Sequence, residues 1–373
     1  MKSKSLYVTQ PSLPDLSRLT PLLENIWKTR VLSNKGPYHD QLEEALCKYL
    51  DVPYISLVSN GTLGLIIALK ALNISGNVIT TPYTFAATAH SIMWNNLQPL
   101  FVDIDRDTLN LDPTLLEQAI TPETTAIMPV HVYGNPCADE EISRIANKYG
   151  LKVIYDSSHA FGVKCASHNI FEFGDLSVLS FHATKVFNTF EGGAIICRSK
   201  EMKEHIDQLK NFGFTNEISV EQIGINGKMN EFSAAIGLLQ LENVDADIEK
   251  RKSIDATYRK ILRSVEGVKC FEYTEGTEAN YSYFPIFINS NFLISRDELY
   301  HKLKDLNIFS RRYFYPIITE LNAYKTHPVL SRNKLSEAYT AAECVLCLPI
   351  FSEMTNSDAK KVANAIISMV SSR

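Results

Sequence analysis

The chain has 373 residues, of which 45% are hydrophobic and 21% charged, so it can bury a sizeable core and form two or three domains. Its formal net charge is −5, and positive and negative residues are interspersed along the chain. This distribution argues against the concentrated basic surface that nucleic-acid binding requires. No apolar run approaches the roughly 18 residues of a membrane span, and the N-terminal segment lacks the apolar centre of a secretion signal. We therefore expect no membrane association and a cytoplasmic location.

Near-continuous runs of Val, Ile, Leu and Phe in the first half predict strands that are buried on both faces. The predicted strands are Tyr54–Val58, Val78–Thr81, Leu100–Ile104, Ala126–Val132, Lys152–Asp156, Leu176–Phe181 and Ala194–Cys197. Helix-periodic segments lie between several of them, most clearly at Gly61–Leu72, Ala86–Trp94 and Glu140–Tyr149. Strands that alternate with helices predict a mostly parallel sheet covered by helices over about residues 50–200.

The pattern changes near Met229, where a stretch up to about Val265 predicts one or two long helices. The remainder combines a strand-like FPIFI, a helix-like segment at 294–306 and a final amphipathic segment from Ser357 to Val370. The predicted fold class is α/β, with a large domain at 1–250 and a smaller α+β domain at 251–373.

Seven cysteines are scattered through apolar or mixed segments, and an odd number does not indicate a disulfide framework. We expect them to be reduced and buried. Cys344 and Cys347 have the spacing of a redox or metal motif, but they lie in the apolar run AAECVLCLPI without a second pair. Core packing is the preferred interpretation, and no metal site is expected.

Ligands of open α/β sheets bind at the carboxyl ends of the strands, so the residues that follow each strand are the first candidates for a binding site. The first strand is followed by SNGT, including Gly61 and Thr62, whose backbone amides at a helix start would suit a phosphate. A plain helix cap is the alternative. The second strand is followed by TPYTFAAT, in which Phe85 could stack on a planar ligand or belong to the core.

Two further strands end in charged residues. Asp156 is the last residue of an apolar strand. A carboxylate there is costly unless it is paired or holds a proton on a bound ligand. The alternative is that Asp156 caps the next turn. Lys185 lies in the mostly apolar segment SFHATKVFNTFEGGAIIC. Such a setting favours an uncharged amine that can form a Schiff base with an aldehyde, whereas the alternatives are exposure to solvent or pairing with Glu191.

Taken together, a phosphate site, a stacking ring, an acid and an amine are the four groups that pyridoxal 5′-phosphate requires. The segments NGTLGL, ITTPYTFAATAHSI, FVDID, HVYG, VIYDSSHAFG, SFHATKVFNTFEGGAI and MNEFSAAIG also resemble those of the DegT/DnrJ/EryC1/StrS sugar aminotransferases. The resemblance extends from about Leu13 to the C-terminus. It implies the fold-type-I, aspartate aminotransferase-like architecture.

The resemblance also implies roles for individual residues. Lys185 would bind the cofactor covalently and move the proton, and Asp156 would pair with the pyridine nitrogen. The remaining cofactor-binding residues implied are Gly61, Thr62, Phe85, His159, Ser180 and Asn230. His159 stands where the family commonly has glutamine, which leaves its protonation state open. Asn230 resembles an asparagine that reaches the phosphate of a neighbouring subunit, which implies a homodimer with a shared active site.

The same resemblance implies transfer of an amino group from L-glutamate to a nucleotide-linked keto-sugar. Members with histidine in place of Lys185 remove a hydroxyl group instead. FHATK and EGGA are typical of enzymes that aminate a 4-keto position, and the expected substrate is dTDP-4-dehydro-6-deoxyglucose in O-antigen synthesis. A 3-keto substrate is the alternative, although such enzymes more often have YPGKNLGA.

Arg311, Arg312 and Tyr313 resemble a stretch near the nucleotide-sugar cleft, but could equally be a solvated face over core aromatics. Two other classes of function stay open. One is a non-catalytic, regulatory pyridoxal phosphate-binding protein. The other is an NAD-dependent enzyme, which is disfavoured because no G-x-G-x-x-G follows a strand.

Overall fold

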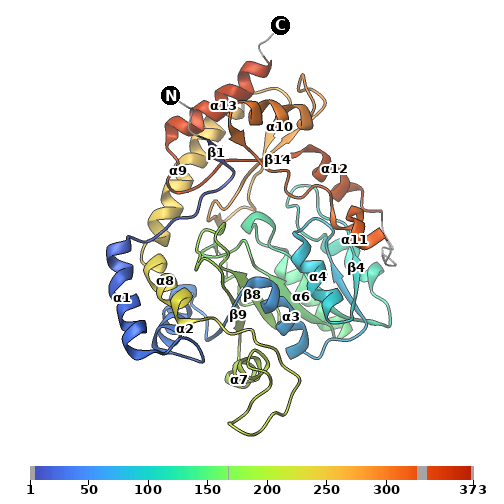
Figure 1. The fold of residues 1–373 in the computed structure, drawn as a ribbon. Coiled ribbons are helices and arrows are strands. Elements are labelled where there is room, and N and C mark those ends of the chain that lie inside the picture. The colour runs from blue at the N-terminus through green and yellow to red at the C-terminus, as the bar shows by residue number, and fades with distance from the viewer. Residues whose placement is uncertain (1–4, 167, 326–333, 371–373) are drawn as a thin grey trace.

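The computed structural model describes residues 5–166, 168–325 and 334–370. A large mixed sheet with helices on both faces forms most of the molecule, and a smaller sheet with its own helices lies at the top of Figure 1. The predicted α/β class is therefore confirmed.

The large sheet has seven strands, and only β9 runs opposite to the others. Its strands in spatial order are β2 (Tyr54–Val58), β9 (Gly193–Cys197), β8 (Leu176–Ser180), β6 (Lys152–Asp156), β5 (Thr124–Met128), β3 (Asn77–Thr80) and β4 (Gln98–Phe101). The carboxyl ends of the six remaining strands thus meet at one edge of the sheet.

Alternate side chains of each strand enter separate cores on the two faces of this sheet, as Val178 and Leu179 of β8 illustrate. One face is covered by α3 (Gly61–Ala71), α4 (Ala86–Trp94) and α7 (Lys200–Leu209). The other is covered by α1 (Leu16–Thr29), α2 (Pro37–Leu50), α5 (Leu116–Ala119), α6 (Asp139–Tyr149) and α8 (Glu231–Leu241). Burial on both faces explains why these strands are so apolar.

The smaller sheet is antiparallel, in the order β10 (Val268–Cys270), β12 (Phe284–Ile288) and β14 (Val345–Leu348). It shares a core with α9 (Val244–Leu262), α10 (Arg296–Asp305) and α13 (Asn356–Val370). The N-terminal strand β1 (Leu6–Tyr7) joins this part by pairing with β13 (Ile308–Phe309). Since α9 runs through residue 250, the division into domains at that point stays a prediction.

The remaining elements are short or connect the two parts. They are β7 (Lys164–Cys165), β11 (Thr277–Glu278), α11 (Asn322–Lys325), α12 (Ser336–Cys344) and 3-10 turns at Pro113–Leu115, Val132–Gly134 and Ile318–Glu320. None of the helices described is both long and apolar enough to cross a bilayer. All seven cysteines are free, but Cys47, Cys165 and Cys344 are only partly buried, because they lie where core-packed elements meet the surface.

Candidate active site

A cavity of about 1140 Å³ lies at the edge where the parallel strands end. Eight of the site residues expected from the sequence line it: Gly61, Thr62, Phe85, Asp156, His159, Ser180, Lys185 and Tyr313. They come from the ends of β2, β3, β6 and β8 and from the smaller part of the chain. Residues spread over some 250 positions of sequence are thus brought to one place by the order of the strands.

The start of α3 forms the expected anion cradle. Asn60 caps this helix by accepting a hydrogen bond from the Leu63 amide at 2.9 Å. A Cβ on Gly61 would lie 2.9 Å from the Ser180 Cβ, and one on Gly193 would lie 2.9 Å from the Gly61 nitrogen. The two glycines therefore allow β8 and β9 to lie close to the first residues of α3. The first residues of α3, whose amides have no partner within the helix, line the cavity.

Asp156 is 4% exposed and sits at the end of β6. Its Oδ2 accepts a hydrogen bond from the Thr88 hydroxyl at 2.7 Å, and its Oδ1 accepts one from the Ser158 amide at 3.1 Å. Thr88 in turn lies 2.8 Å from the hydroxyl of Thr84. Both contacts are donors, so both carboxylate oxygens act as acceptors, and the bond to Ser158 also fits the turn-capping alternative.

Lys185 supplies an amine to the same cavity. Burial lowers its pKa to about 8, and the Asp156 carboxylate acts weakly in the opposite direction. Within the part of the chain described, no ion pair joins it to Glu191, whose carboxylate lies 3.5 Å from His182 instead. The amine is therefore available to a ligand, as the Schiff-base interpretation requires.

We expect the nucleophilicity of Lys185 to rise with pH around a midpoint near 8 in protein prepared without cofactor. An amine reacts only when unprotonated, so a lowered pKa moves the rise to lower pH than for free lysine, which titrates at about 10.4. Labelling with an amine reagent, quantified by peptide mass spectrometry, measures this midpoint. A midpoint equal to that of an Nα-acetyl-lysine control would contradict the lowered pKa of the Lys185 amine.

The structure settles which nitrogen of His159 carries a proton. Its Nδ1 accepts a hydrogen bond from the Tyr133 amide at 3.2 Å, so Nε2 carries the hydrogen of the neutral ring. Burial, followed by the charge of Lys185, holds the pKa of His159 well below its ordinary value. Both observations favour a neutral ring that can donate a hydrogen bond from Nε2.

An aromatic wall from the smaller part of the chain lines the cavity, and one of its rings, Phe314, lies in the stretch 310–316 that resembles a family segment near the nucleotide-sugar cleft. The ring of Phe314 stacks on His159 at 6.0 Å, and Tyr283 meets the same histidine edge-on at 4.9 Å. Both line the cavity, as do His182 and Glu191. Tyr283 carries no local signal because it meets the site only through tertiary folding, whereas Phe314 directly follows Tyr313. His182 and Glu191 belong to FHATK and EGGA.

Three of the expected site residues do not line this cavity. Asn230 is exposed and caps α8, accepting a hydrogen bond from the Ser233 amide at 2.8 Å. Arg312 pairs with Asp297 at 2.8 Å, and Arg311 is exposed beside β14. The roles expected for these three residues stay predictions.

A buried group of metal-ligand types, His131, Cys137 and Asp139, does not line the cavity, although the His131 amide donates to the Asp156 carbonyl at 3.1 Å. The Cys137 amide donates to His131 Nδ1 at 3.0 Å, so the proton of the neutral ring is on Nε2. A metal bound to Nε2 would require the ring proton to move to Nδ1, which already accepts a hydrogen bond from the Cys137 amide. This arrangement opposes ligation, and the expectation of no metal stays a prediction.

Comparison with known proteins places this site in a family. Residues 17–367 match the model of the DegT/DnrJ/EryC1/StrS aminotransferase family. The chain is 52% identical to a dTDP-4-amino-4,6-dideoxy-D-glucose transaminase of Shigella dysenteriae, over 97% of this chain and 98% of that protein. It is 48% identical to a transaminase of the same name from Escherichia coli, over 98% and 99% of the two chains.

A solved structure agrees with the sequence matches. DesI, in the presence of its TDP-sugar product, superposes with a TM-score of 0.94 at 33% identity, covering 100% of this chain and 94% of that one. The family match spans both the large sheet and the smaller part. The chain therefore belongs to the DegT/DnrJ/EryC1/StrS aminotransferase family, as its motifs predicted.

Proposed function

We propose that the protein uses pyridoxal 5′-phosphate to move the amino group of L-glutamate to the fourth carbon of dTDP-4-dehydro-6-deoxyglucose, giving dTDP-4-amino-4,6-dideoxyglucose. The observation that carries the proposal is the single cavity in which Lys185, Asp156 and the cradle at Gly61 meet. Two full-length relatives at 52% and 48% identity bear the name of this transaminase, which supports the sugar and the nucleotide. The cytoplasmic location stays a prediction.

The residues present fit the cofactor. The Lys185 amine has a pKa lowered to about 8 by burial, and the Asp156 carboxylate accepts hydrogen bonds only. Phe85 lines the cavity with 60% of its surface exposed, so its ring has a free face for stacking. The close approach of Gly61 to Ser180 brings the Ser180 hydroxyl beside the start of α3, and both residues line the cavity.

Each of these residues then has a defined task. Bound pyridoxal phosphate supplies an aldehyde that reacts with amines and a ring that accepts electrons from the carbon next to the nitrogen. Lys185 Nζ would move a proton from the amino-acid carbon to the cofactor carbon, a role suited to a pKa near the working pH. Asp156 would stabilise positive charge at the ring nitrogen, and His159 would donate from Nε2. Gly61, Thr62 and Ser180 would hold the phosphate.

The glutamate half of the reaction can be tested without sugar. Addition of L-glutamate to the cofactor-loaded protein should change the absorbance of the cofactor and release one equivalent of 2-oxoglutarate per subunit, after which the reaction stops. The keto-sugar should then restore the original spectrum. A protein that binds cofactor but gives no 2-oxoglutarate would support a non-catalytic, regulatory role instead.

We further propose a homodimer with a shared site, in which a second copy covers exposed apolar side chains. The loop between α7 and α8 exposes Ile218 by 90% and Ile223 by 86%, and α1 exposes Trp27 by 72%. Ile223 also lines the active-site cavity, which makes that cavity continuous with this apolar surface. Exposed apolar side chains of this size are candidates for a contact with another protein.

Hybrid dimers test whether Asn230 serves the partner's site. Lys185→Ala and Asn230→Ser subunits should each be nearly inactive alone, and serine keeps a helix cap at position 230. When the two are refolded together, each hybrid should regain one intact site, because the unmodified Lys185 and Asn230 then come from different subunits. Absence of any regained activity, with hybrids shown by mass spectrometry, would contradict the shared site.

A further inference from the structure

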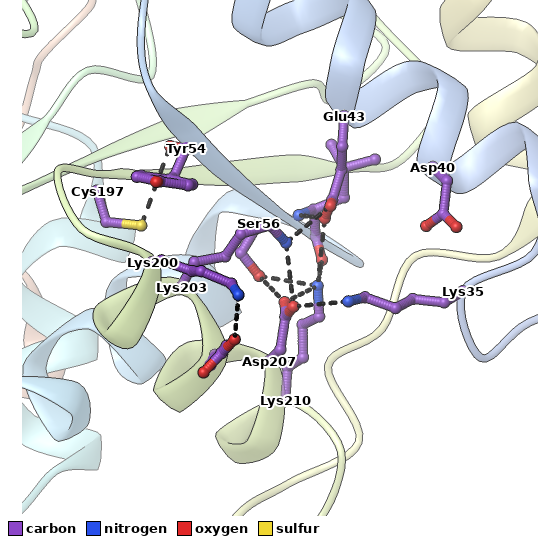
Figure 2. A network of polar contacts seen from close by, with 12 residues as sticks. Lys35, Asp40, Glu43, Tyr54, Ser56, Cys197, Lys200, Lys203, Asp207 and Lys210 are labelled. Carbon is purple, nitrogen blue, oxygen red and sulfur yellow. Dashed lines mark hydrogen bonds and ion pairs between the residues drawn. The ribbon is translucent and has the colours of Figure 1, made fainter.

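A network of buried ions lies beneath the strand that leads to the anion cradle (Figure 2). Lys210 follows α7 and is 3% exposed, and its Nζ lies 2.8 Å from Asp207 and 2.8 Å from the Ser56 hydroxyl. Lys203 lies 2.7 Å from Glu43 of α2 and 3.0 Å from Asp207. Lys210 and Glu43 are buried, and Lys203 and Asp207 are partly buried. Buried charges are costly unless each has its partners, so these contacts hold α2, α7 and β2 in fixed positions.

This network completes the hydrogen bonding of an edge strand. β2 has β9 on one side only, and Leu57 directs its backbone groups to the open side. Glu43 accepts a hydrogen bond from the Leu57 amide at 3.1 Å, and Lys210 donates one to the Leu57 carbonyl at 2.9 Å. A carboxylate and an ammonium thus take the place of a neighbouring strand.

The same lysine is connected to the residue before the cradle. The Lys210 carbonyl accepts a hydrogen bond from the Gly227 amide at 2.9 Å, and the Gly227 carbonyl accepts one from the Ser59 amide at 2.8 Å. Ser59 directly precedes Asn60 and Gly61, where α3 begins. Lys210 therefore holds this strand through its side chain at Leu57 and through its backbone at Ser59.

We propose that Lys210 and Glu43 are positioning residues for the anion cradle formed by residues 60–62. They do not line the active-site cavity, and they act through the backbone of β2. The inference rests on the proposed function, because it takes the cofactor's phosphate as the anion held there. Its consequence is selective: disturbing the network should weaken binding of the phosphate group more than binding of the pyridine ring.

The double variant Glu43→Gln/Lys210→Met tests this, since it removes one charge of each sign and keeps the net charge of the network. Affinities for pyridoxal phosphate and for pyridoxal, which lacks the phosphate, are measured by absorbance titration of protein prepared without cofactor. We expect the affinity for pyridoxal phosphate to fall roughly tenfold or more, as is common when a supporting contact is lost. The affinity for pyridoxal should stay unchanged.

Lys203→Met is the matched control, because Lys203 belongs to the same network but its ion pairs are with Glu43 and Asp207 and not with β2. It should lower the melting temperature and leave the ratio of the two affinities as in the unmodified protein. Ser56→Ala removes a single hydroxyl from the Lys210 contacts. It should lower the ratio of the affinity for pyridoxal phosphate to that for pyridoxal, by less than the double variant does. This variant keeps the test available if the double variant does not fold.

An equal loss for both ligands, or an unchanged ratio in the double variant and in Ser56→Ala, would overturn the positioning role. Failure of the unmodified protein to bind pyridoxal phosphate would instead overturn the proposed function.

Discussion

Replacing Lys185 with alanine is expected to lower the rate of amino transfer by about 10⁴-fold while cofactor and aminated sugar still bind. The variant loses a cavity-lining amine whose pKa, about 8, suits proton transfer at neutral pH. The cradle, the ring contact and the carboxylate remain in place. Steady-state rates, together with absorbance titration of the cofactor, measure both halves of this expectation.

A matched control is Lys164→Ala, which removes an exposed lysine from β7. It should leave both the rate and the cofactor affinity unchanged. Turnover of Lys185→Ala at the rate of the unmodified protein would show that another group moves the proton and would remove the basis of the site assignment.

Replacing Asp156 with asparagine is expected to lower the rate by about 10²- to 10³-fold with the fold intact, the usual cost of removing one electrostatic contact in an active site. A neutral amide cannot stabilise positive charge on the ring nitrogen. Its oxygen can still accept a hydrogen bond from Thr88 or Ser158, so stability should change little. Rates and thermal melting of the same preparation separate the two effects.

Asp175→Asn provides the corresponding control. Asp175 accepts a hydrogen bond from the Val153 amide near the start of the same strand, at 2.9 Å, and it pairs with Lys152. We expect this variant to lose some stability and keep its rate. If Asp156→Asn behaved in the same way, Asp156 would be a structural residue only.

The sequence predicted the buried strands well where polar residues bound them. The strands Tyr54–Val58 and Lys152–Asp156 have the predicted bounds, and Ser59 and Ser157 directly follow their last residues. The strand expected over Ala126–Val132 instead ends at Met128. Val130 and Val132 are buried in a core with residues of the smaller part of the chain, and a run of apolar residues cannot distinguish a strand from a buried loop.

The site was predictable to the extent that its residues follow strands. Gly61, Asp156 and Lys185 each lie at or shortly after a strand end, and the parallel topology brings them together. The proton position on His159 depends on the Tyr133 amide, and the wall formed by Phe314 depends on the packing of the smaller part on the larger one. Contacts of this kind are set by tertiary structure and leave no local pattern in the sequence.

The most direct test of the central claim is incubation of the cofactor-loaded protein with ¹⁵N-labelled L-glutamate and dTDP-4-dehydro-6-deoxyglucose, followed by NMR of the sugar. The account predicts an equatorial ¹⁵N-amine on the fourth carbon. With the cofactor demonstrably bound, a sugar without nitrogen would contradict the proposed substrate, and amination of a 3-keto nucleotide sugar instead would assign the protein to the other subclass.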